Sequence, residues 1–139
     1  MASIFSRIVQ GEIPAAKIYE DDQTLAFLDI NPATRGHALV ICKEEYPDLL
    51  SVPPDLLAAV VQTTQKVARA ITEALKPDGY NVMQNNGSAA GQEVFHYHVH
   101  IVPRWEGDNA VRAWKQGTAD TQELQELATL ISQQVQSVQ

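Results

Sequence analysis

The feature that most constrains the fold is a run of seven residues, HYHVHIV, in which histidine alternates with apolar side chains. In a β-strand, alternate side chains lie on one face, and a step of two residues advances about 6.6 Å. The run predicts a strand over residues 95–102 that stops at Pro103, with His96, His98 and His100 in a row. The other side chains are expected to face the core: Phe95, Tyr97, Val99 and Ile101.

The rest of the chain predicts an α+β fold with a mainly antiparallel, five-stranded sheet, because strand runs surround one long helix. A length of 139 residues suits a single domain over 1–139, with a core at about 4–104 and a tail with a last helix at 105–139. The other expected elements are helix 4–10, strands 16–20, 24–29 and 37–42, a long helix from about Pro53 to the breaker at 77–79, strand 80–84, and a last short amphipathic helix carrying Leu124, Leu127, Ala128, Ile131 and Val135.

Charge and composition narrow the classes of partner. The net charge is −7 and the basic residues are scattered singly, which disfavours binding to a nucleic-acid polymer. The single cysteine, Cys42, excludes an intramolecular disulfide and the usual cysteine-based zinc spacings. Arg7 and Glu12 interrupt any signal-peptide core, and no apolar run reaches the roughly 20 residues that span a bilayer. We therefore expect a cytoplasmic protein that does not bind membranes.

Three interpretations of the histidine row are open. The rings could be solvated polar groups on the open face of a sheet, but three in alternation, out of only four in the chain, argue against this. They could belong to a metal site, although the outermost pair lies about 13 Å apart in a regular strand. They could attack phosphorus, because a neutral imidazole with a pKa of about 6.5 is nucleophilic at pH 7. We favour the last.

A loop rich in small residues, 85–91, comes shortly before the row. Small residues let the backbone approach a ligand, and successive N–H groups can cradle an oxyanion. On its own such a loop is usually a plain turn. Beside three aligned histidines it predicts a phosphate site.

Several separated motifs resemble the histidine triad (HIT) family, and in order and spacing its Hint-like branch, the histidine triad nucleotide-binding proteins. The alternating run matches the signature of the family. The resemblance extends over about the first hundred residues, through Ile4–Phe5, Gly11-Glu12-Ile13-Pro14, Phe27 to Pro32, Gly36–His37 and Pro103–Arg104. It implies a HIT-like fold and a homodimer that hydrolyses or transfers purine nucleoside monophosphates.

The resemblance also implies roles for individual residues. His98 would form a nucleotidyl-histidine intermediate and His100 would contact the α-phosphate, supported by His37 and His96. Asp29 would hold the ribose hydroxyls. Asn85 and the backbone of Gly91, Gln92 and Glu93 would line the phosphate pocket, and Phe5, Ile13, Phe27 and Ile30 would pack around the base.

The chain departs from the family pattern at two places. Many bacterial relatives bind structural zinc through two cysteines, a later histidine and the first triad histidine, whereas this chain has Ser3, Ser6 and Glu45 at the first three positions. We therefore expect neither a metal ion nor another cofactor. Glu93 stands where the Hint branch often has a serine beside the leaving group, which bears on leaving-group preference.

The expected activity is hydrolysis of purine nucleoside phosphoramidates at the α-phosphate, releasing the nucleoside monophosphate. Two alternatives remain open. One is the hydrolysis of dinucleoside polyphosphates, as in the Fhit-like branch. The other is a nucleotide-binding or interaction protein with little turnover.

Overall fold

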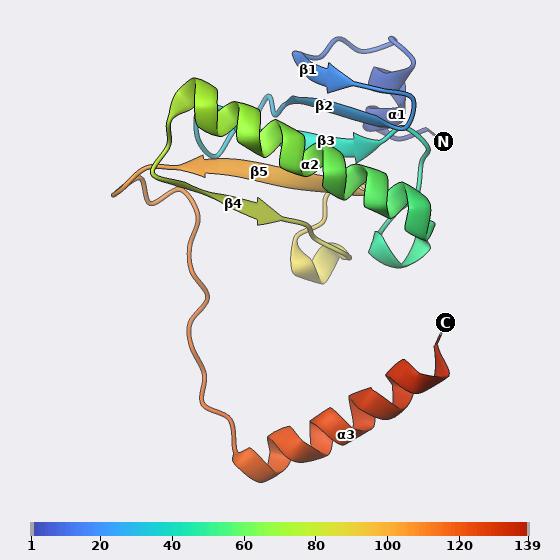
Figure 1. Ribbon diagram of the computed structural model, residues 1–139, viewed down its shortest axis with the longest axis vertical. Helices are drawn as coiled ribbons and strands as arrows, with labels where there is room; N and C mark the ends of the chain where they lie inside the picture. The colour runs from blue at the N-terminus through green and yellow to red at the C-terminus, as the bar shows by residue number, and fades with distance from the viewer. Residues whose placement is uncertain (1, 139) are drawn as a thin grey trace.

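The computed structural model describes residues 2–138 and has the predicted α+β architecture, with a five-stranded antiparallel sheet (Figure 1). The strand order is β1-β2-β3-β5-β4, and every neighbouring pair runs antiparallel. The strands are β1 (Lys17–Glu20), β2 (Thr24–Leu28), β3 (Ala38–Cys42), β4 (Gly79–Met83) and β5 (His98–Arg104); the helices are α1 (Ile4–Val9), α2 (Pro54–Leu75) and α3 (Thr121–Ser137); Leu49–Ser51 and Ser88–Ala90 form short 3-10 turns.

Helix α2 lies across one face of the sheet, and α1 lies on the other (Figure 1). All five residues of β3 are buried, because side chains from this strand pack on both faces of the sheet. Ala38, Val40 and Cys42 belong to the cluster that packs under α2, whereas Leu39 and Ile41 pack with Phe5 and Ile8 of α1. Leu39 pairs with His100 and Ile41 with His98, so both histidines lie on the α1 face.

The histidine strand differs from its predicted bounds at both ends. It begins at His98, because the segment before it leaves the sheet ladder and the N–H of Tyr97 donates instead to the carbonyl of Tyr46 at 2.7 Å. The prediction that Phe95 faces the core is wrong: this side chain is 48% exposed. Tyr97, Val99 and Ile101 do pack in the core under α2, as expected.

The strand also continues past Pro103, where we expected it to stop. β3 pairs with β5 only as far as Ile101, so Pro103 has a neighbouring strand only on the β4 side. Its carbonyl accepts a hydrogen bond from the Thr34 hydroxyl at 2.6 Å, on the side away from β4. The nitrogen of a strand residue faces the same way as its carbonyl, so proline removes no ladder hydrogen bond here.

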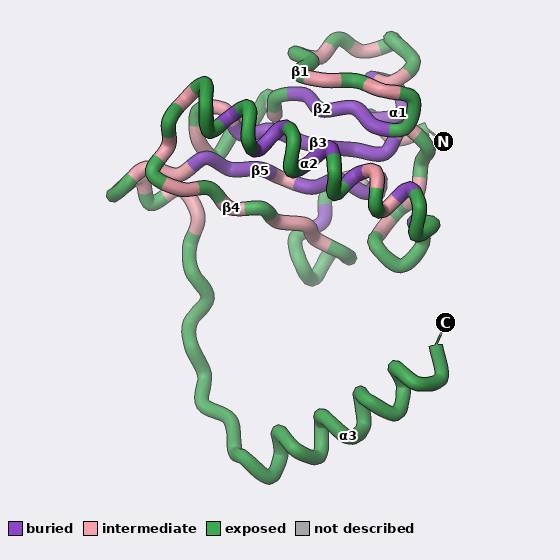
Figure 2. The backbone as a smooth tube through the Cα atoms, in the orientation of Figure 1, coloured by how far each residue is buried: buried purple, intermediate pink, exposed green. Residues whose placement is uncertain are grey.

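The segment after β5 leaves the sheet and ends in α3, which has no buried residue (Figures 1 and 2). Its first turn is capped by Asp120, whose carboxylate accepts from the N–H of Glu123 at 3.1 Å. The last helix is thus present, and it is longer than the short helix we expected. No helix between residues 2 and 138 is long and apolar enough to cross a membrane.

Candidate functional site

The histidine face of the sheet forms one wall of a pocket of about 300 Å³ beside α1. β5 contributes His98 and His100, and α1 contributes apolar side chains that lie over them. The pocket is lined by Ile4, Phe5, Ile8, Ile13, Pro14, Ala15, Phe27, Leu28, Asp29, Ile30, Asn31, Leu39, Glu93, Val94, His98 and His100.

His98 is held with one ring nitrogen free. Its Nδ1 lies 2.6 Å from the backbone carbonyl of His96, an oxygen that can only accept, so Nδ1 carries the proton. The lone pair is therefore on Nε2. The ring of Phe5 packs edge-on against the His98 imidazole, with centroids 5.0 Å apart. A buried imidazole with a defined tautomer and an unprotonated Nε2 is what nucleophilic attack requires.

His96 is fully buried and does not reach the pocket. Its Nε2 lies 2.6 Å from the carbonyl of Cys42, so this nitrogen carries the proton. Its Nδ1 accepts from the Ser3 hydroxyl at 2.7 Å. Both ring nitrogens of His96 are thus bonded, and its backbone carbonyl binds His98.

His37 and His100 form a directed pair. The backbone N–H of Ala33 donates to His37 Nδ1 at 3.0 Å, which leaves the His37 proton on Nε2. That proton is donated to His100 Nδ1 at 2.9 Å, so His100 carries its own proton on Nε2. Asp29 lies close by, with Oδ2 3.6 Å from His37 Nε2. Although Asp29, His37 and His100 place three ligand-type atoms within 4.8 Å, the ring pair already uses its two facing nitrogens.

Burial lowers the pKa of all four histidines below their ordinary value. For His100, burial together with the nearby His98 and His37 lowers the pKa to about 4. For His98, burial dominates and outweighs the His96 carbonyl and Asp29, both of which raise its pKa. All four rings are therefore neutral at pH 7, which agrees with the tautomers that their hydrogen bonds assign.

The residues expected to bind the nucleoside lie together on this pocket. Phe5, Ile13 and Phe27 line it, with Ile30 at the rim, where its side chain is 85% exposed. Asp29 is also on the wall, and its Oδ1 accepts from the N–H of Asn31 at 2.9 Å. An apolar wall beside a carboxylate suits a base and a ribose diol.

Four residues were expected to bind phosphate: Asn85, Gly91, Gln92 and Glu93. Of these, only Glu93 lines the pocket. The N–H groups of Gly91 and Gln92 are bonded inside the loop, to the carbonyls of Ser88 and Gly87. The Gln92 side chain is buried and binds Gly87 N, Pro47 O and Val94 O, so it holds the loop together.

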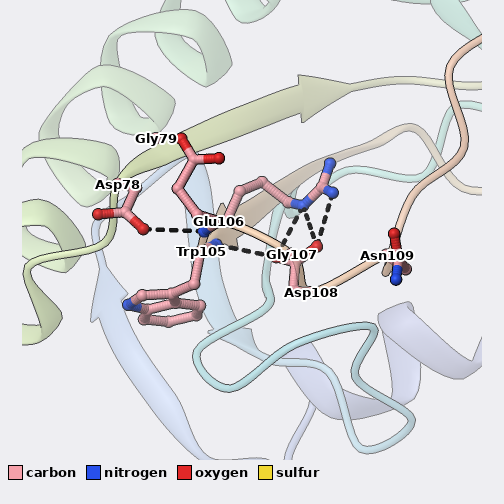
Figure 3. Close-up of a pocket in the computed structure, with 8 residues that line it drawn as sticks. Asp78, Gly79, Trp105, Glu106, Gly107, Asp108 and Asn109 are labelled. Atoms are coloured by element: carbon pink, nitrogen blue, oxygen red, sulfur yellow. Dashed lines mark hydrogen bonds and ion pairs between the residues drawn. The ribbon is translucent and has the colours of Figure 1, made fainter.

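A second hollow lies at the other end of β5 and contains no histidine (Figure 3). Arg104 pairs there with Asp108, with Nη2 and Oδ1 2.7 Å apart. The Asp108 carboxylate also accepts from the N–H groups of Trp105 and Ala110, and Asp78 accepts from Glu106 N–H. These bonds set the direction in which the chain leaves the sheet toward α3.

Sequence reasoning missed several groups that shape the site. Ile8, Pro14, Leu39 and Val94 line the pocket but carry no signal beyond being apolar. Three of the four tautomers are set by backbone atoms: the carbonyls of Cys42 and His96 and the N–H of Ala33. Every residue has such atoms, so the side-chain pattern could not single them out.

Comparison with known proteins gives a consistent match. The model of the HIT domain family matches residues 10–107. Protein hit from Bacillus subtilis is 42% identical over 96% of this chain and 94% of its own length. Adenosine 5'-monophosphoramidase hnt1 from Schizosaccharomyces pombe is 44% identical over 75% of both chains. Adenylylsulfatase HINT3 from Arabidopsis thaliana is 46% identical over 76% of this chain and 53% of its own.

Solved structures agree with the fold. A crystal structure of a HIT family member from Bacillus subtilis superposes with a TM-score of 0.91, at 38% identity and 96% coverage of both chains. A zinc-bound histidine triad family protein from Mycobacterium smegmatis gives a TM-score of 0.75, at 40% identity and 99% coverage of both chains.

The residues at the zinc positions implied by the family do not suit that ion. Zinc prefers thiolate, imidazole and carboxylate ligands. Two of the four positions are Ser3 and Ser6, whose neutral hydroxyls are poor zinc ligands. The Nδ1 of His96 and Oε1 of Glu45 already accept hydrogen bonds from these serines.

Proposed function

The chain belongs to the HIT domain family, and we propose that it hydrolyses purine nucleoside phosphoramidates at the α-phosphate through a nucleotidyl-histidine intermediate. The observation that carries the proposal is the His96 carbonyl bound to Nδ1 of His98, which leaves Nε2 unprotonated and beside the pocket. One relative is named as an adenosine 5'-monophosphoramidase and another as an adenylylsulfatase. These names support substrates that share an adenosine monophosphate group and differ in the leaving group.

In the first step, the Nε2 lone pair of His98 attacks the α-phosphorus and forms a phosphorus–nitrogen bond. The bond to the leaving amine breaks, and its electron pair stays with the amine, which takes a proton from solvent. The Nε2–H of His100 donates to a phosphate oxygen, since His37 occupies the other nitrogen of this ring. Preorganised donors of this kind usually contribute more than any other effect to the stabilisation of developing charge.

In the second step, water attacks the phosphorus of the histidine adduct. The bond from phosphorus to Nε2 breaks, and its electron pair returns to His98. The water proton is released to solvent, which balances the proton taken up in the first step. The nucleoside monophosphate then leaves a pocket whose carboxylate, Asp29, binds the ribose hydroxyls and whose aromatic wall, Phe5 and Phe27, contacts the base.

Glu93 favours an amine over a polyphosphate as the leaving group. Its exposed side chain lies on the wall of the pocket. A carboxylate there attracts a departing ammonium and repels the anionic phosphates of a dinucleoside polyphosphate. The same charge distinguishes this pocket from that of relatives with a serine at this position.

The test compares the rates on an adenosine phosphoramidate of a primary amine and on a diadenosine polyphosphate. We expect kcat/KM to be higher for the phosphoramidate by about tenfold or more, the effect of roughly 1.4 kcal/mol from one nearby charge. Glu93→Ser should reduce this ratio, whereas Glu73→Gln, an exposed residue of α2, should leave it unchanged. A faster rate on the polyphosphate would favour the Fhit-like alternative, and negligible rates on both would favour a binding protein.

The active form in this proposal is a homodimer assembled through α3. Exposed apolar side chains line this helix, including Leu127, Leu130, Ile131 and Val135. The Bacillus subtilis crystal structure matches over 96% of the chain with a TM-score of 0.91, which requires its last helix to occupy a similar position. An apolar helix face that is held away from its own domain is suited to a second copy of the chain.

Sedimentation velocity tests the dimer directly. The full chain is expected to sediment at twice its mass of 15.3 kDa. Replacing Leu127 and Ile131 with serine should give a monomer, because it removes apolar contact area, while Gln133→Ser in the same helix should leave the dimer intact. A wild-type protein that remains monomeric at micromolar concentration would rule out this part of the proposal.

A further inference from the structure

Helix α1 is attached to the segments that follow β3 and precede β5 through a small polar cluster formed by Ser3, Ser6, Glu45 and His96. Glu45 Oε1 accepts from the backbone N–H of Ser3 at 2.7 Å and from the Ser6 hydroxyl at 2.6 Å. The Ser3 hydroxyl accepts from the N–H of Ser6 at 3.0 Å and donates to His96 Nδ1 at 2.7 Å. Each of these groups therefore has a partner, and the hydroxyl protons have defined directions.

The cluster is linked to the nucleophile by hydrogen bonds on both sides of His96 and by the covalent frame of that residue. His96 is fully buried between the Ser3 hydroxyl and the carbonyl of Cys42. The carbonyl of the same residue holds Nδ1 of His98 at 2.6 Å. The ring that the cluster holds and the acceptor that determines which nitrogen of His98 is free thus belong to the same residue.

The cluster also places an aromatic ring on the active-site histidine. Phe5 lies between Ser3 and Ser6 in sequence, at the start of α1. Its ring packs edge-on against His96 and His98, with centroid distances of 5.8 and 5.0 Å, and against Phe27 at 5.5 Å. The two serines thus hold the turn of helix that forms the wall of the pocket.

We propose that Ser3, Ser6 and Glu45 are positioning residues that act through His96 as a metal-free clamp on the catalytic histidine. The clamp holds the His96 carbonyl against Nδ1 of His98 and keeps Phe5 on the His98 ring. This proposal rests on the proposed function for its kinetic consequence, but not for the tautomer of His98 or the metal-free nature of the clamp. Ser6 Oγ lies only 3.4 Å from His96 Nδ1, so one hydroxyl can partly replace the other.

The first test removes both hydroxyls with the double variant Ser3→Ala/Ser6→Ala and restores them with Ser3→Thr/Ser6→Thr. Long-range ¹H–¹⁵N spectra of histidine-labelled protein at pH 7 should show His98 protonated on Nδ1 in the wild type and a mixture of tautomers in the alanine variant. We expect kcat to fall by about tenfold to a hundredfold, since displacement of a catalytic group by about 1 Å has effects of this size. The threonine variant should regain both properties, and Ser132→Ala in exposed α3 should match the wild type.

An alanine variant with the wild-type His98 tautomer and the wild-type kcat would overturn the proposal. A changed tautomer in a protein whose wild type does not cleave phosphoramidates would support the clamp and refute the proposed function. If the double variant does not fold, the single variant Ser3→Ala should show smaller changes in the same direction, because the Ser6 hydroxyl can partly replace the missing one.

The second test addresses the metal. Purified protein should contain no stoichiometric zinc by elemental analysis. Chelation with EDTA should leave its melting temperature and the long-range ¹H–¹⁵N spectrum of its histidines unchanged. Added Zn²⁺ should bind no more tightly to the wild type than to the Glu45→Gln variant. One zinc per chain, lost in Glu45→Gln together with a lower melting temperature, would show that the cluster holds a metal and would overturn the proposal.

Discussion

Replacing His98 with alanine is expected to lower turnover of an adenosine phosphoramidate by about 10⁴-fold or more, the usual scale for loss of a covalent nucleophile. The reason is specific to this ring: its Nδ1 is bound to the His96 carbonyl and only Nε2 is free to attack. The wild type should form a labelled adduct with a substrate carrying ³²P at the α-phosphate, and the variant should form none. Rapid acid quenching would miss this adduct, because phosphorus–nitrogen bonds hydrolyse in acid, so the quench is made in alkali.

His98→Asn is the matched control for this prediction. An asparagine amide can still donate to the His96 carbonyl but has no nucleophilic nitrogen, so the variant should fold and bind the monophosphate while remaining inactive.

Wild-type adduct formation should persist somewhat below pH 6.5 and then fall, because burial lowers the pKa of His98 and keeps the ring neutral at lower pH. A His98→Ala protein with wild-type turnover would exclude this residue as the nucleophile.

Gly36→Ala is expected to destabilise the protein by about 2 to 3 kcal/mol. Gly36 has φ +90°, a left-handed conformation that costs a residue with a Cβ about 1–2 kcal/mol. An added methyl group would also collide with the Leu75 side chain and lie 3.4 Å from Pro103 Cγ, so Leu75 must rotate away from its packing position. Urea unfolding of the two proteins measures the difference in the free energy of unfolding.

Gly11→Ala separates the two causes. Gly11 has φ +80°, similar to Gly36, but an added methyl group there meets no atom within 4 Å. It should therefore show the backbone cost alone, about 1–2 kcal/mol. Equal losses at the two positions would show that the contact with Leu75 contributes nothing. The position of Gly36 matters for the site because it ends the loop whose Ala33 N–H holds His37.

Periodicity along the chain was enough to predict the sheet, the long helix and the facing of most side chains. The alternation of His98, Val99, His100 and Ile101 is a local pattern, and in the structure the two histidines face the pocket while the two apolar residues pack under α2. The stripe of apolar residues in α2 likewise predicted the helix that covers the sheet. The resemblance to the HIT family, rather than any spacing, was what associated Asp29 and Phe5 with these histidines, and both line the same pocket.

The protonation pattern of the site could not be obtained in that way. It depends on contacts between residues far apart in sequence: His96 with Cys42, His37 with His100, and Ser3 with His96. Three of the deciding partners, the carbonyls of Cys42 and His96 and the N–H of Ala33, are backbone groups, which are chemically the same at every position and leave no mark on the pattern of side chains. The extension of β5 through Pro103 has a similar origin, since proline is acceptable there only because β3 ends its pairing at Ile101. Local patterns specify which face a side chain occupies, whereas the hydrogen-bond partners that fix its tautomer arise only when the strands, the loop and helix α1 come together.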